Sequence, residues 1–506
     1  NWTIDGKSIC TASTLTFSAD EAGRYFILIS ATNAGGTTEK EIRIDVFQLD
    51  IPTISIADAN KGFKVLQGSE LTITPIVDSF LETNYSWQIN GEDISNELTC
   101  TLPTIELGEY QVRFATHNED GDDEVTFKVE VCSPDQVDFN WTFLQTEYNM
   151  SAGRTIRIKP VDVNNALDAV YTWTVDNEQV QSGENDTYLF TSEQQGEHTV
   201  KVEMKNSYIL ATQTLKVNVC PPAGTYQRKI SATSSASMNK VYEYLPAPGQ
   251  FINENHNTTT MAEACTYAEE RINQTAYVSL GGFGGYIIVG FDHSIVNDGD
   301  YNIAITGNAF DGSSEPGIVW VMQDENGDGL PNDTWYELRG SEYGKAEAWQ
   351  DYAVTYHKPT GIQLPTPWTD NHGQSGSIDY LGAFHRQDYY YPAWVKEKQY
   401  TLRGTRLKER NYDQSGNGTY WVNDSYEWGY ADNFSAIDRL TDDDNYNAGP
   451  SDNHFKISHA VTFDGKDANL KYVDFIKVQV GVNSKSGWLG EISTEVFGIK
   501  DFNMLE

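Results

Sequence analysis

Long apolar runs are missing from this chain of 506 residues. No run approaches the roughly 18 apolar residues that a membrane-spanning helix requires. A signal peptide is missing too, and the chain opens at Asn1, close before a segment with the pattern of a strand. We therefore expect any export signal or lipid anchor to lie upstream of residue 1.

Basic residues are scarce. Lys and Arg number 35 against 73 Asp and Glu, which gives a net charge of −38. A chain with this charge repels phosphate backbones and anionic membrane surfaces. We therefore exclude nucleic acid as a partner and expect membrane contact only through an upstream lipid anchor.

Cysteine is also rare, with five residues in the whole chain. Cys132 and Cys220 occupy equivalent places at the ends of two sequence repeats, so they do not suit a disulfide pair. Cys265 lies on the apolar face of a predicted helix. We expect free, buried thiols, and the sequence assigns no disulfide.

The common catalytic motifs are missing as well. The run GQSGS at Gly373 breaks the nucleophile-elbow pattern after its serine, and the chain has no H-E-x-x-H, no phosphate-binding glycine loop and no C-x-x-C. GGFGG at Gly281 precedes a strand, which predicts a tight turn with close backbone approach. Carboxylates are abundant, but no two of them stand out as a glycosidase pair. We expect no enzyme.

Three segments repeat within the first 220 residues. Trp2, Trp87 and Trp173 open WTIDGK, WQINGE and WTVDNE, at spacings of 85 (87 − 2) and 86 (173 − 87) residues. Each copy continues with Gly, one residue and Tyr or His, and closes with an alternating segment such as VTFKVEV. Period-two alternation with Asp-Gly and Asn-Gly turns indicates antiparallel strands. A repeat of this length with a core Trp suits an immunoglobulin-like sandwich.

The repeats resemble the PKD-like and immunoglobulin-like modules of bacterial surface proteins. They contain no cluster of metal-ligating side chains, so we interpret them as spacers. The run CPPAGTY at Cys220 reads as a linker. The predicted domains are a partial repeat at 1–49, repeats at 50–133 and 134–221, and a C-terminal ligand-binding β domain at 222–506.

The C-terminal region contains one predicted helix among many short strand-like runs. Thr260 and Glu263 form a capping box, and the apolar face consists of Met261, Ala264, Cys265, Ala268 and Ile272. GWLGEISTEVFGI resembles the closing strands of galactose-binding-like jelly rolls. The predicted fold class is all-β: tandem immunoglobulin/PKD-like β-sandwiches, then a larger jelly-roll-like β-sandwich domain with long loops and one short helix.

The segment DENGDGLPND places oxygen-bearing side chains at alternate positions before the Gly329 turn. Such spacing lets several oxygens converge on one hard cation. The first half matches an EF-hand loop, but position 12 is Trp335 in place of Glu. We predict a structural Ca²⁺ in a loop of another type, and the alternative is an acidic turn between strands. The predicted ligands are Asp324, Asn326, Asp328, the Leu330 carbonyl and Asp333.

Aromatic and turn residues crowd the loops from about 368 to 432. Flat amphipathic side chains beside amides and carboxylates suit a binding surface, and the alternative is core packing. Three consecutive tyrosines cannot all face inward from a strand. The predicted ligand-binding residues are Arg386, Tyr389, Tyr390, Tyr391, Trp394, Tyr420, Trp421, Asn423, Asp424 and Trp428.

Several long motifs carry a resemblance that covers roughly the last 280 residues. They include GGFGGYIIVGFDHSI, SSEPGIVWVMQDENGDGLPNDTWYEL, NYDQSGNGTYWV, EWGYADN and GWLGEISTEV. The region resembles PKD-containing cell-surface lipoproteins of Bacteroidetes, among them the surface cobalamin-binding proteins of corrinoid-uptake loci. The resemblance implies an outer-membrane-anchored protein on the extracellular face that captures cobalamin and passes it to a TonB-dependent transporter.

A second hypothesis stays open beside cobalamin capture. The same domain could be a calcium-stabilised carbohydrate-binding or adhesive module. Cobalamin binding predicts a pocket wide enough for a corrin ring, with amide partners at its rim. Carbohydrate binding predicts a shallow aromatic platform or groove.

Overall fold

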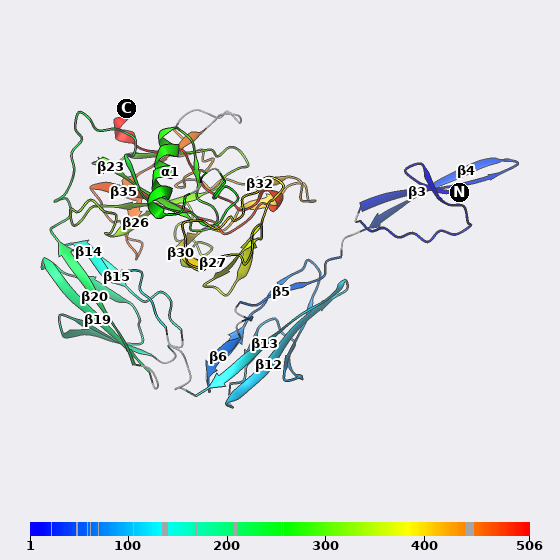
Figure 1. Cartoon of the computed structure of the whole chain (residues 1–506), viewed down its shortest axis with the longest axis horizontal. Coiled ribbons are helices and arrows are strands. Elements are labelled where there is room, and N and C mark those ends of the chain that lie inside the picture. The colour runs from blue at the N-terminus through cyan, green and yellow to red at the C-terminus, as the bar shows by residue number, and fades with distance from the viewer. Residues whose placement is uncertain are drawn as a thin grey trace. The chain divides into compact units, whose positions relative to one another are not determined.

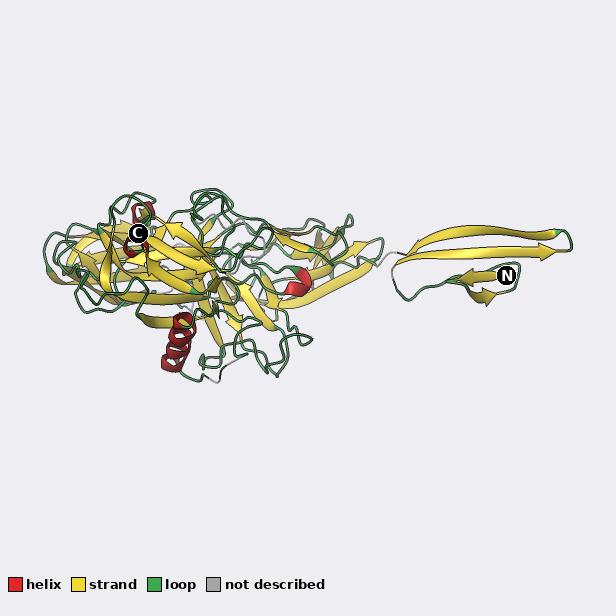
Figure 2. Ribbon diagram, turned by 90° about the horizontal axis from the view of Figure 1, so that it is seen from above, coloured by secondary structure: helices red, strands yellow, loops and turns green. Residues whose placement is uncertain are grey.

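A computed structural model describes residues 1–505, apart from 22, 47–48, 58, 61, 69, 105, 134–139, 165, 167–168, 207–209, 255, 257 and 441–449. The chain forms two compact units, Asn1–Cys132 and Ser133–Glu506. Strands dominate both units, and α1 (Met261–Asn273) is the one α-helix among the described residues (Figure 1, Figure 2). The predicted all-β fold class is confirmed.

The first repeat is a single antiparallel sheet in its described residues. Its strands are β1 (Trp2–Ile4), β2 (Lys7–Cys10), β3 (Gly23–Asn33) and β4 (Gly36–Val46). They lie in the order β2-β1-β3-β4. Trp2 remains partly exposed in this sheet.

The second repeat buries its Trp between sheets. Its strands are β5 (Thr53–Ser55), β6 (Phe63–Leu66), β7 (Leu71–Ile73), β8 (Ile76–Asp78), β9 (Asn84–Ile89), β10 (Glu92–Ser95), β11 (Cys100–Leu102), β12 (Gly108–Asn118) and β13 (Gly121–Cys132). The main sheet has the order β10-β9-β12-β13-β6, and two-stranded sheets β11-β7 and β5-β8 complete the repeat. Trp87 is fully buried in its core.

The third repeat has the same plan. Its strands are β14 (Glu147–Ser151), β15 (Thr155–Ile158), β16 (Val170–Val175), β17 (Glu178–Gly183), β18 (Tyr188–Thr191), β19 (Gly196–Lys205) and β20 (Leu210–Cys220). The main sheet has the order β14-β20-β19-β16-β17, and β15 pairs with β18. Trp173 fills the core without exposure to solvent.

The Gly-x-aromatic motif has one structural role in all three repeats. Tyr25 Oη and Tyr110 Oη donate hydrogen bonds to the carbonyls of Glu21 and Glu106, four residues earlier, over 2.8 and 3.0 Å. In the third repeat, His198 Nε2 lies 2.9 Å from the equivalent carbonyl of Gln194. The aromatic ring therefore fixes the loop that enters the long strand, and histidine substitutes for tyrosine.

The described residues of the C-terminal domain form five sheets of two to six strands. Its strands are β21 (Lys240–Leu245), β22 (Val278–Ser279), β23 (Tyr286–Val296), β24 (Ile303–Gly307), β25 (Gly317–Met322), β26 (Trp335–Leu338), β27 (Trp349–His357), β28 (Thr366–Asp370), β29 (Ser375–Ile378), β30 (Gln399–Arg406), β31 (Asn411–Asp413), β32 (Trp421–Asn423), β33 (Ser451–Phe455), β34 (Ala460–Val461), β35 (Tyr472–Val480), β36 (Glu495–Val496) and β37 (Gly498–Asp501). Short 3-10 helices are η2 (Ile457–His459), η3 (Gly487–Leu489) and η4 (Phe502–Met504).

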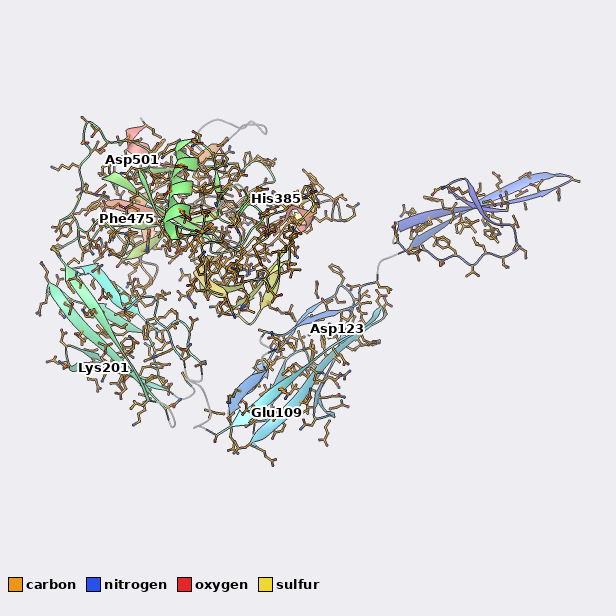
Figure 3. All side chains as sticks on the ribbon, in the orientation of Figure 1. Glu109, Asp123, Lys201, His385, Phe475 and Asp501 are labelled. Atoms are coloured by element: carbon orange, nitrogen blue, oxygen red, sulfur yellow. The ribbon has the colours of Figure 1, made fainter. Side chains whose placement is uncertain are left out.

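A six-stranded sheet in the order β21-β23-β35-β25-β26-β34 forms the centre of this domain. Smaller sheets are β33-β24-β37, β29-β28-β27-β30, β22-β36 and β31-β32. One hydrophobic cluster joins apolar residues of these sheets with those of α1. β35 lies inside the main sheet and is buried along nearly its whole length, including the polar residues Asp474 and Gln479. Phe475 on this strand is completely buried (Figure 3).

Two local predictions are confirmed. Glu263 N donates to Thr260 Oγ1, and Thr260 N donates to the Glu263 carboxylate, so the capping box starts α1. At Gly281, whose φ is +71°, a Cβ would lie 2.0 Å from the carbonyl oxygen of Ala247. This glycine therefore permits the close backbone approach that GGFGG predicts.

The five cysteines are free, and Cys100, Cys132 and Cys220 are buried. Among the described residues, no helix has the length and apolar character needed to cross a membrane.

Candidate functional site: an aromatic patch and a calcium loop

Tyr390, Tyr391 and Trp394 are core residues, which corrects their predicted role in a ligand surface. All three are buried in the main hydrophobic cluster. Their polar atoms are satisfied inside the protein, because Tyr390 Oη, Tyr391 Oη and Trp394 Nε1 donate to backbone carbonyls. The segment is an irregular loop, so successive side chains do not alternate and neighbouring tyrosines both point inward. Tyr389 is half-buried and packs against the same cluster.

The other predicted residues do not gather around one point. Trp428 contacts the ring of His459 and lines a cavity of about 240 Å³. Arg386 and Asp424 are exposed. Asn423 is buried, and its Oδ1 accepts a hydrogen bond from Ser486 Oγ at 2.6 Å. Asn423 therefore positions a neighbouring segment and is not available as a surface contact.

Tyr420 and Trp421 belong to an exposed apolar surface that we call the aromatic patch. Its members are Tyr420, Trp421, Phe384, Trp488 and Leu489. The side chains of Trp488 and Phe384 are 51% and 65% exposed, and their ring centroids lie 6.3 Å apart. Trp421 packs on Gly487, where a Cβ would lie 2.2 Å from the indole Nε1. Three separate segments therefore meet here, Phe384 and Trp488 through their rings and Trp421 through Gly487.

Two constrained loops display the patch. Gly487 and Gly490 flank the bulky pair Trp488 and Leu489, with φ values of +52° and +89°. Ser486 N donates to the Gly490 carbonyl at 2.8 Å and closes this turn. On the other side, Trp421 starts β32, which pairs with β31. The positive φ values favour glycine, so the backbone fixes where the large side chains project.

Polar groups surround the patch. Lys485 Nζ pairs with Asp379 at 2.9 Å, and Asn411 Nδ2 donates to the Lys485 carbonyl at 2.7 Å. Arg386 is exposed two residues after Phe384 and donates to the Gly382 carbonyl. An apolar centre with amide, ammonium and carboxylate groups at its edge suits an amphipathic ligand.

Sequence reasoning missed Trp488 and Phe384. Trp488 is the only aromatic residue in GWLGE, which lies outside the aromatic-rich loops from about 368 to 432. The available signal was the pair of glycines around Trp488-Leu489, since such a short turn leaves bulky residues little space to fold inward. Phe384 carried no signal of its own.

The predicted calcium loop is folded around its first carboxylate. Asp324 is buried, and its two oxygens accept hydrogen bonds from Gly327 N and Gly329 N at 2.7 and 3.0 Å. Asp328 Oδ2 accepts from the side-chain amides of Asn326 and Asn332, both at 2.9 Å. These N–H groups partly offset the negative charge of Asp324 and Asp328.

Asp333 provides the test of whether this loop suits a metal. It is buried, its Oδ2 accepts from Glu325 N at 3.0 Å, and its Oδ1 has no hydrogen-bond partner among the described residues. Burial, together with the nearby charges of Glu325, Asp324 and Asp328, raises the pKa of Asp333 to about 8. A buried acceptor without a donor, inside a set made only of oxygens, fits a hard cation. The Leu330 side chain is exposed, so only its carbonyl could contribute.

The third repeat contacts this loop within the same compact unit. Ser151 Oγ donates to Glu325 Oε1 at 3.0 Å, and Asn149 Nδ2 lies 3.4 Å from the Asn332 carbonyl. Arg154 Nε lies 3.8 Å from the Glu325 carboxylate. Burial raises the pKa of Glu325 to about 7, and the Arg154 charge opposes that shift. The repeat therefore covers one side of the loop.

The comparisons with known proteins concern the repeats. The profile of the PKD-like domain family matches residues 51–118 and 123–206. The comparison with curated proteins gave no match. Residues 51–206 therefore contain PKD-like repeats, as predicted.

Similar solved structures are tandem β-sandwich modules. Fibronectin(III)-like modules of Clostridium thermocellum CbhA are 16% identical over 36% of this chain and 99% of that chain, with a TM-score of 0.18. The Ig1-2 module of Drosophila receptor protein tyrosine phosphatase DLAR is 11% identical over 33% and 98%, also with a TM-score of 0.18. A chimeric titin Z1Z2 is 20% identical over 34% and 98%, with a TM-score of 0.20.

Proposed function

We propose that this chain is a non-catalytic binding protein of the cell surface, and that its aromatic patch captures cobalamin or a related corrinoid. The observation that carries the proposal is the surface where the exposed rings of Trp488 and Phe384 lie beside each other and half-buried Trp421 packs on Gly487. The Trp488 and Phe384 side chains are more than half exposed, so core packing does not explain their position. Large apolar groups rimmed by polar residues mark interaction sites.

The chemistry of the patch suits a corrinoid. A corrin ring has broad apolar edges and a fringe of amides. The indoles of Trp421 and Trp488 supply flat apolar area at a low cost in side-chain entropy. Lys485, Asp379 and Arg386 at the edge supply donors and acceptors for amides. The choice of a corrinoid over other flat ligands comes from the resemblance of the C-terminal motifs to surface cobalamin-binding proteins.

One observation favours carbohydrate binding as a second candidate. The rings of Trp488 and Phe384 project from the domain with more than half of their area exposed. Rings with this exposure form an open platform and do not enclose a pocket. Sugar rings stack on platforms of this type, so a calcium-stabilised carbohydrate-binding or adhesive module would use the same residues.

The remaining parts have supporting roles in this proposal. The repeats before residue 222 are spacers that hold the last domain away from an outer membrane, where an upstream lipid anchor attaches the protein. A Ca²⁺ ion in the loop from Asp324 to Asp333 stabilises the domain without taking part in chemistry. A captured corrinoid would pass to a TonB-dependent transporter.

Calorimetric titration of the whole chain separates the two candidates. Cyanocobalamin and a panel of neutral oligosaccharides are titrated in buffer with Ca²⁺. Saturable binding of cyanocobalamin, with no heat from the sugars, supports corrinoid capture. Heat from a sugar alone assigns the patch to carbohydrate, and no heat from either contradicts both candidates.

A further inference from the structure

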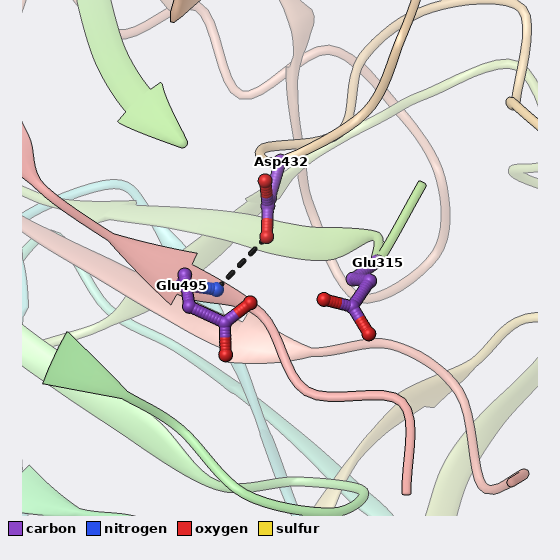
Figure 4. A group of neighbouring side chains, drawn as sticks. All are labelled: Glu315, Asp432 and Glu495. Carbon is purple, nitrogen blue, oxygen red and sulfur yellow. Dashed lines mark hydrogen bonds between the residues drawn. The ribbon is translucent and has the colours of Figure 1, made fainter. Parts of the chain in front are cut away.

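Three carboxylates converge inside the C-terminal domain, and none of them belongs to the aromatic patch or to the predicted calcium loop. Glu315 precedes β25, Asp432 lies in the loop after the aromatic segment, and Glu495 starts β36. One ligand oxygen from each lies within 4.8 Å of the others. Figure 4 shows the three side chains directed toward one another. We call this group the carboxylate trio.

The trio is short of positive charge and of hydrogen-bond donors. Asp432 and Glu495 are buried, and in the described part of the chain none of the three forms a salt bridge. Glu495 Oε1 is buried and has no hydrogen-bond donor among the described residues. One oxygen of the Glu315 carboxyl group lies within 4.8 Å of one oxygen of the Glu495 carboxyl group. Two ionised carboxylates this close inside a protein repel each other unless a proton or a cation lies between them.

Asp432 and Glu495 are buried and Glu315 is half-buried, so water does not solvate the three carboxyl groups fully. An ionised trio would therefore be costly without a counter-ion, because buried charges require a partner. Backbone N–H groups offset only part of this cost. Asn308 N and Glu495 N donate to the two oxygens of Asp432, at 2.8 and 2.9 Å.

The backbone is built to hold Asp432 in place. Asp432 has a φ of +53°, in the left-handed region that non-glycine residues rarely adopt. Gly307 lies so close that a Cβ there would be 2.5 Å from Asp432 Oδ1. Glu315 N also donates to the Asp432 carbonyl at 2.9 Å. Strained backbone of this kind concentrates at functional sites.

We propose that the carboxylate trio binds one hard divalent cation, Ca²⁺. The donors are all oxygens, which hard cations require. Oxygens bound to one Ca²⁺ at about 2.3–2.6 Å lie up to roughly 5 Å apart, which is the span of the trio. Mg²⁺ fits less well, because it keeps several waters and demands near-ideal octahedral geometry. The site is separate from the loop at Asp324, so the domain holds two cations.

A cation at the carboxylate trio would hold three backbone segments together. Segments 310–317, 421–432 and 484–496 meet at the trio. Ser493 N lies 3.4 Å from Glu315 Oε1, and Thr494 Oγ1 donates to the Glu315 carbonyl. The same segments carry Trp421 and Trp488, so the cation fastens together the backbone behind the aromatic patch.

The test counts bound metal. The whole chain is stripped with chelator, and equilibrium dialysis against radioactive Ca²⁺ gives the ions bound per chain. We expect Glu495→Gln to bind one ion fewer than the parent, and Asp328→Asn in the calcium loop to lose a different ion, so that the double variant loses both. A parent that binds no Ca²⁺, or a Glu495→Gln chain with the parent's stoichiometry, overturns the proposal and leaves the trio as a proton-filled cluster.

If Glu495→Gln fails to fold, the unsubstituted chain still allows a test. It is crystallised with Mn²⁺ in place of Ca²⁺, and anomalous scattering locates the bound Mn²⁺. A peak between Glu315, Asp432 and Glu495 supports the site. Absence of a peak there, at a Mn²⁺ concentration that fills other sites, contradicts it.

Discussion

The indole of Trp421 lies on Gly487 so closely that a Cβ at residue 487 would come within 2.2 Å of its Nε1. Gly487 directly precedes Trp488, so this contact brings together the two segments that carry the indoles of the patch. One comes from the β31–β32 hairpin and the other from η3. Residue 487 must be glycine for two reasons. A Cβ would collide with the Trp421 indole, and the φ of Gly487 is positive at +52°.

We expect Gly487→Ala to weaken ligand binding at least tenfold, because the added methyl must displace Trp421. The left-handed backbone alone should cost about 1 kcal/mol of stability. Gly344→Ala is the matched control, since Gly344 has a φ of +78° and no atom within 4 Å of the added Cβ. Calorimetric affinity and thermal unfolding of both variants check this. Equal affinities in the two variants would show that the Trp421 contact is irrelevant to binding.

Trp394 should behave as a core residue. Replacing it with Ala removes a buried indole and leaves a cavity, so we expect a loss of about 3–5 kcal/mol of unfolding free energy. Trp488→Ala should change stability by less than about 1 kcal/mol, because half of its side chain is already in water. Urea unfolding of the two variants measures both. A Trp394→Ala chain as stable as the parent would contradict the burial of this ring.

Glu337 on β26 should make the free energy of unfolding depend on pH. Burial raises its pKa from 4.5 to about 7, and Thr405 Oγ1 donates to its carboxyl group at 2.6 Å. The folded chain therefore keeps a proton that the unfolded chain releases at lower pH. Stability from this group is present below about pH 4.5 and is lost as the pH rises to about 7.

We expect Glu337→Gln to remove this loss, which amounts to at most about 3 kcal/mol. The amide oxygen can still accept from Thr405, so the neutral form is imitated. Unfolding free energies from pH 4 to pH 8 should fall less steeply for the variant than for the parent. Glu427→Gln, at an exposed position, serves as control. Parallel curves for parent and Glu337→Gln would exclude a raised pKa.

The repeats should be dispensable for ligand binding, but the point of truncation matters. A chain that begins near residue 140 keeps the third repeat on the calcium loop and should bind and melt as the whole chain does. A chain that begins at Ala223 loses the Ser151 hydrogen bond to Glu325. We expect it to bind within tenfold of the parent, about 1.4 kcal/mol, yet to melt at a lower temperature. Loss of binding in the chain that begins near residue 140 would assign the ligand to residues before 140.

Local patterns predicted much of the fold. The Trp repeats, the alternating strands and the Thr260 capping box depend on neighbours in sequence, and the structure confirms them. Tyr390 and Tyr391 show where prediction from local sequence patterns fails. Their number and spacing suggested a surface, but most residues of the hydrophobic cluster that buries them come from distant segments.

The candidate sites show the same difference between neighbours in sequence and neighbours in space. The calcium loop is contiguous, so spacing alone could propose it. The trio joins residues far apart in the chain, and nothing near Glu315, Asp432 or Glu495 distinguishes them from other carboxylates in an acidic protein. Trp488 and Trp421 likewise meet only through the fold.

The central claim is that the aromatic patch is the ligand surface, and calorimetry of Trp488→Ala with cyanocobalamin tests it most directly. Phe80→Ala is the matched control, because Phe80 is 96% exposed and lies in the second repeat. The account predicts parental affinity for Phe80→Ala and a loss of roughly thirtyfold or more for Trp488→Ala, the cost of about 2 kcal/mol that an aromatic anchor carries. Parental affinity in Trp488→Ala would contradict the account.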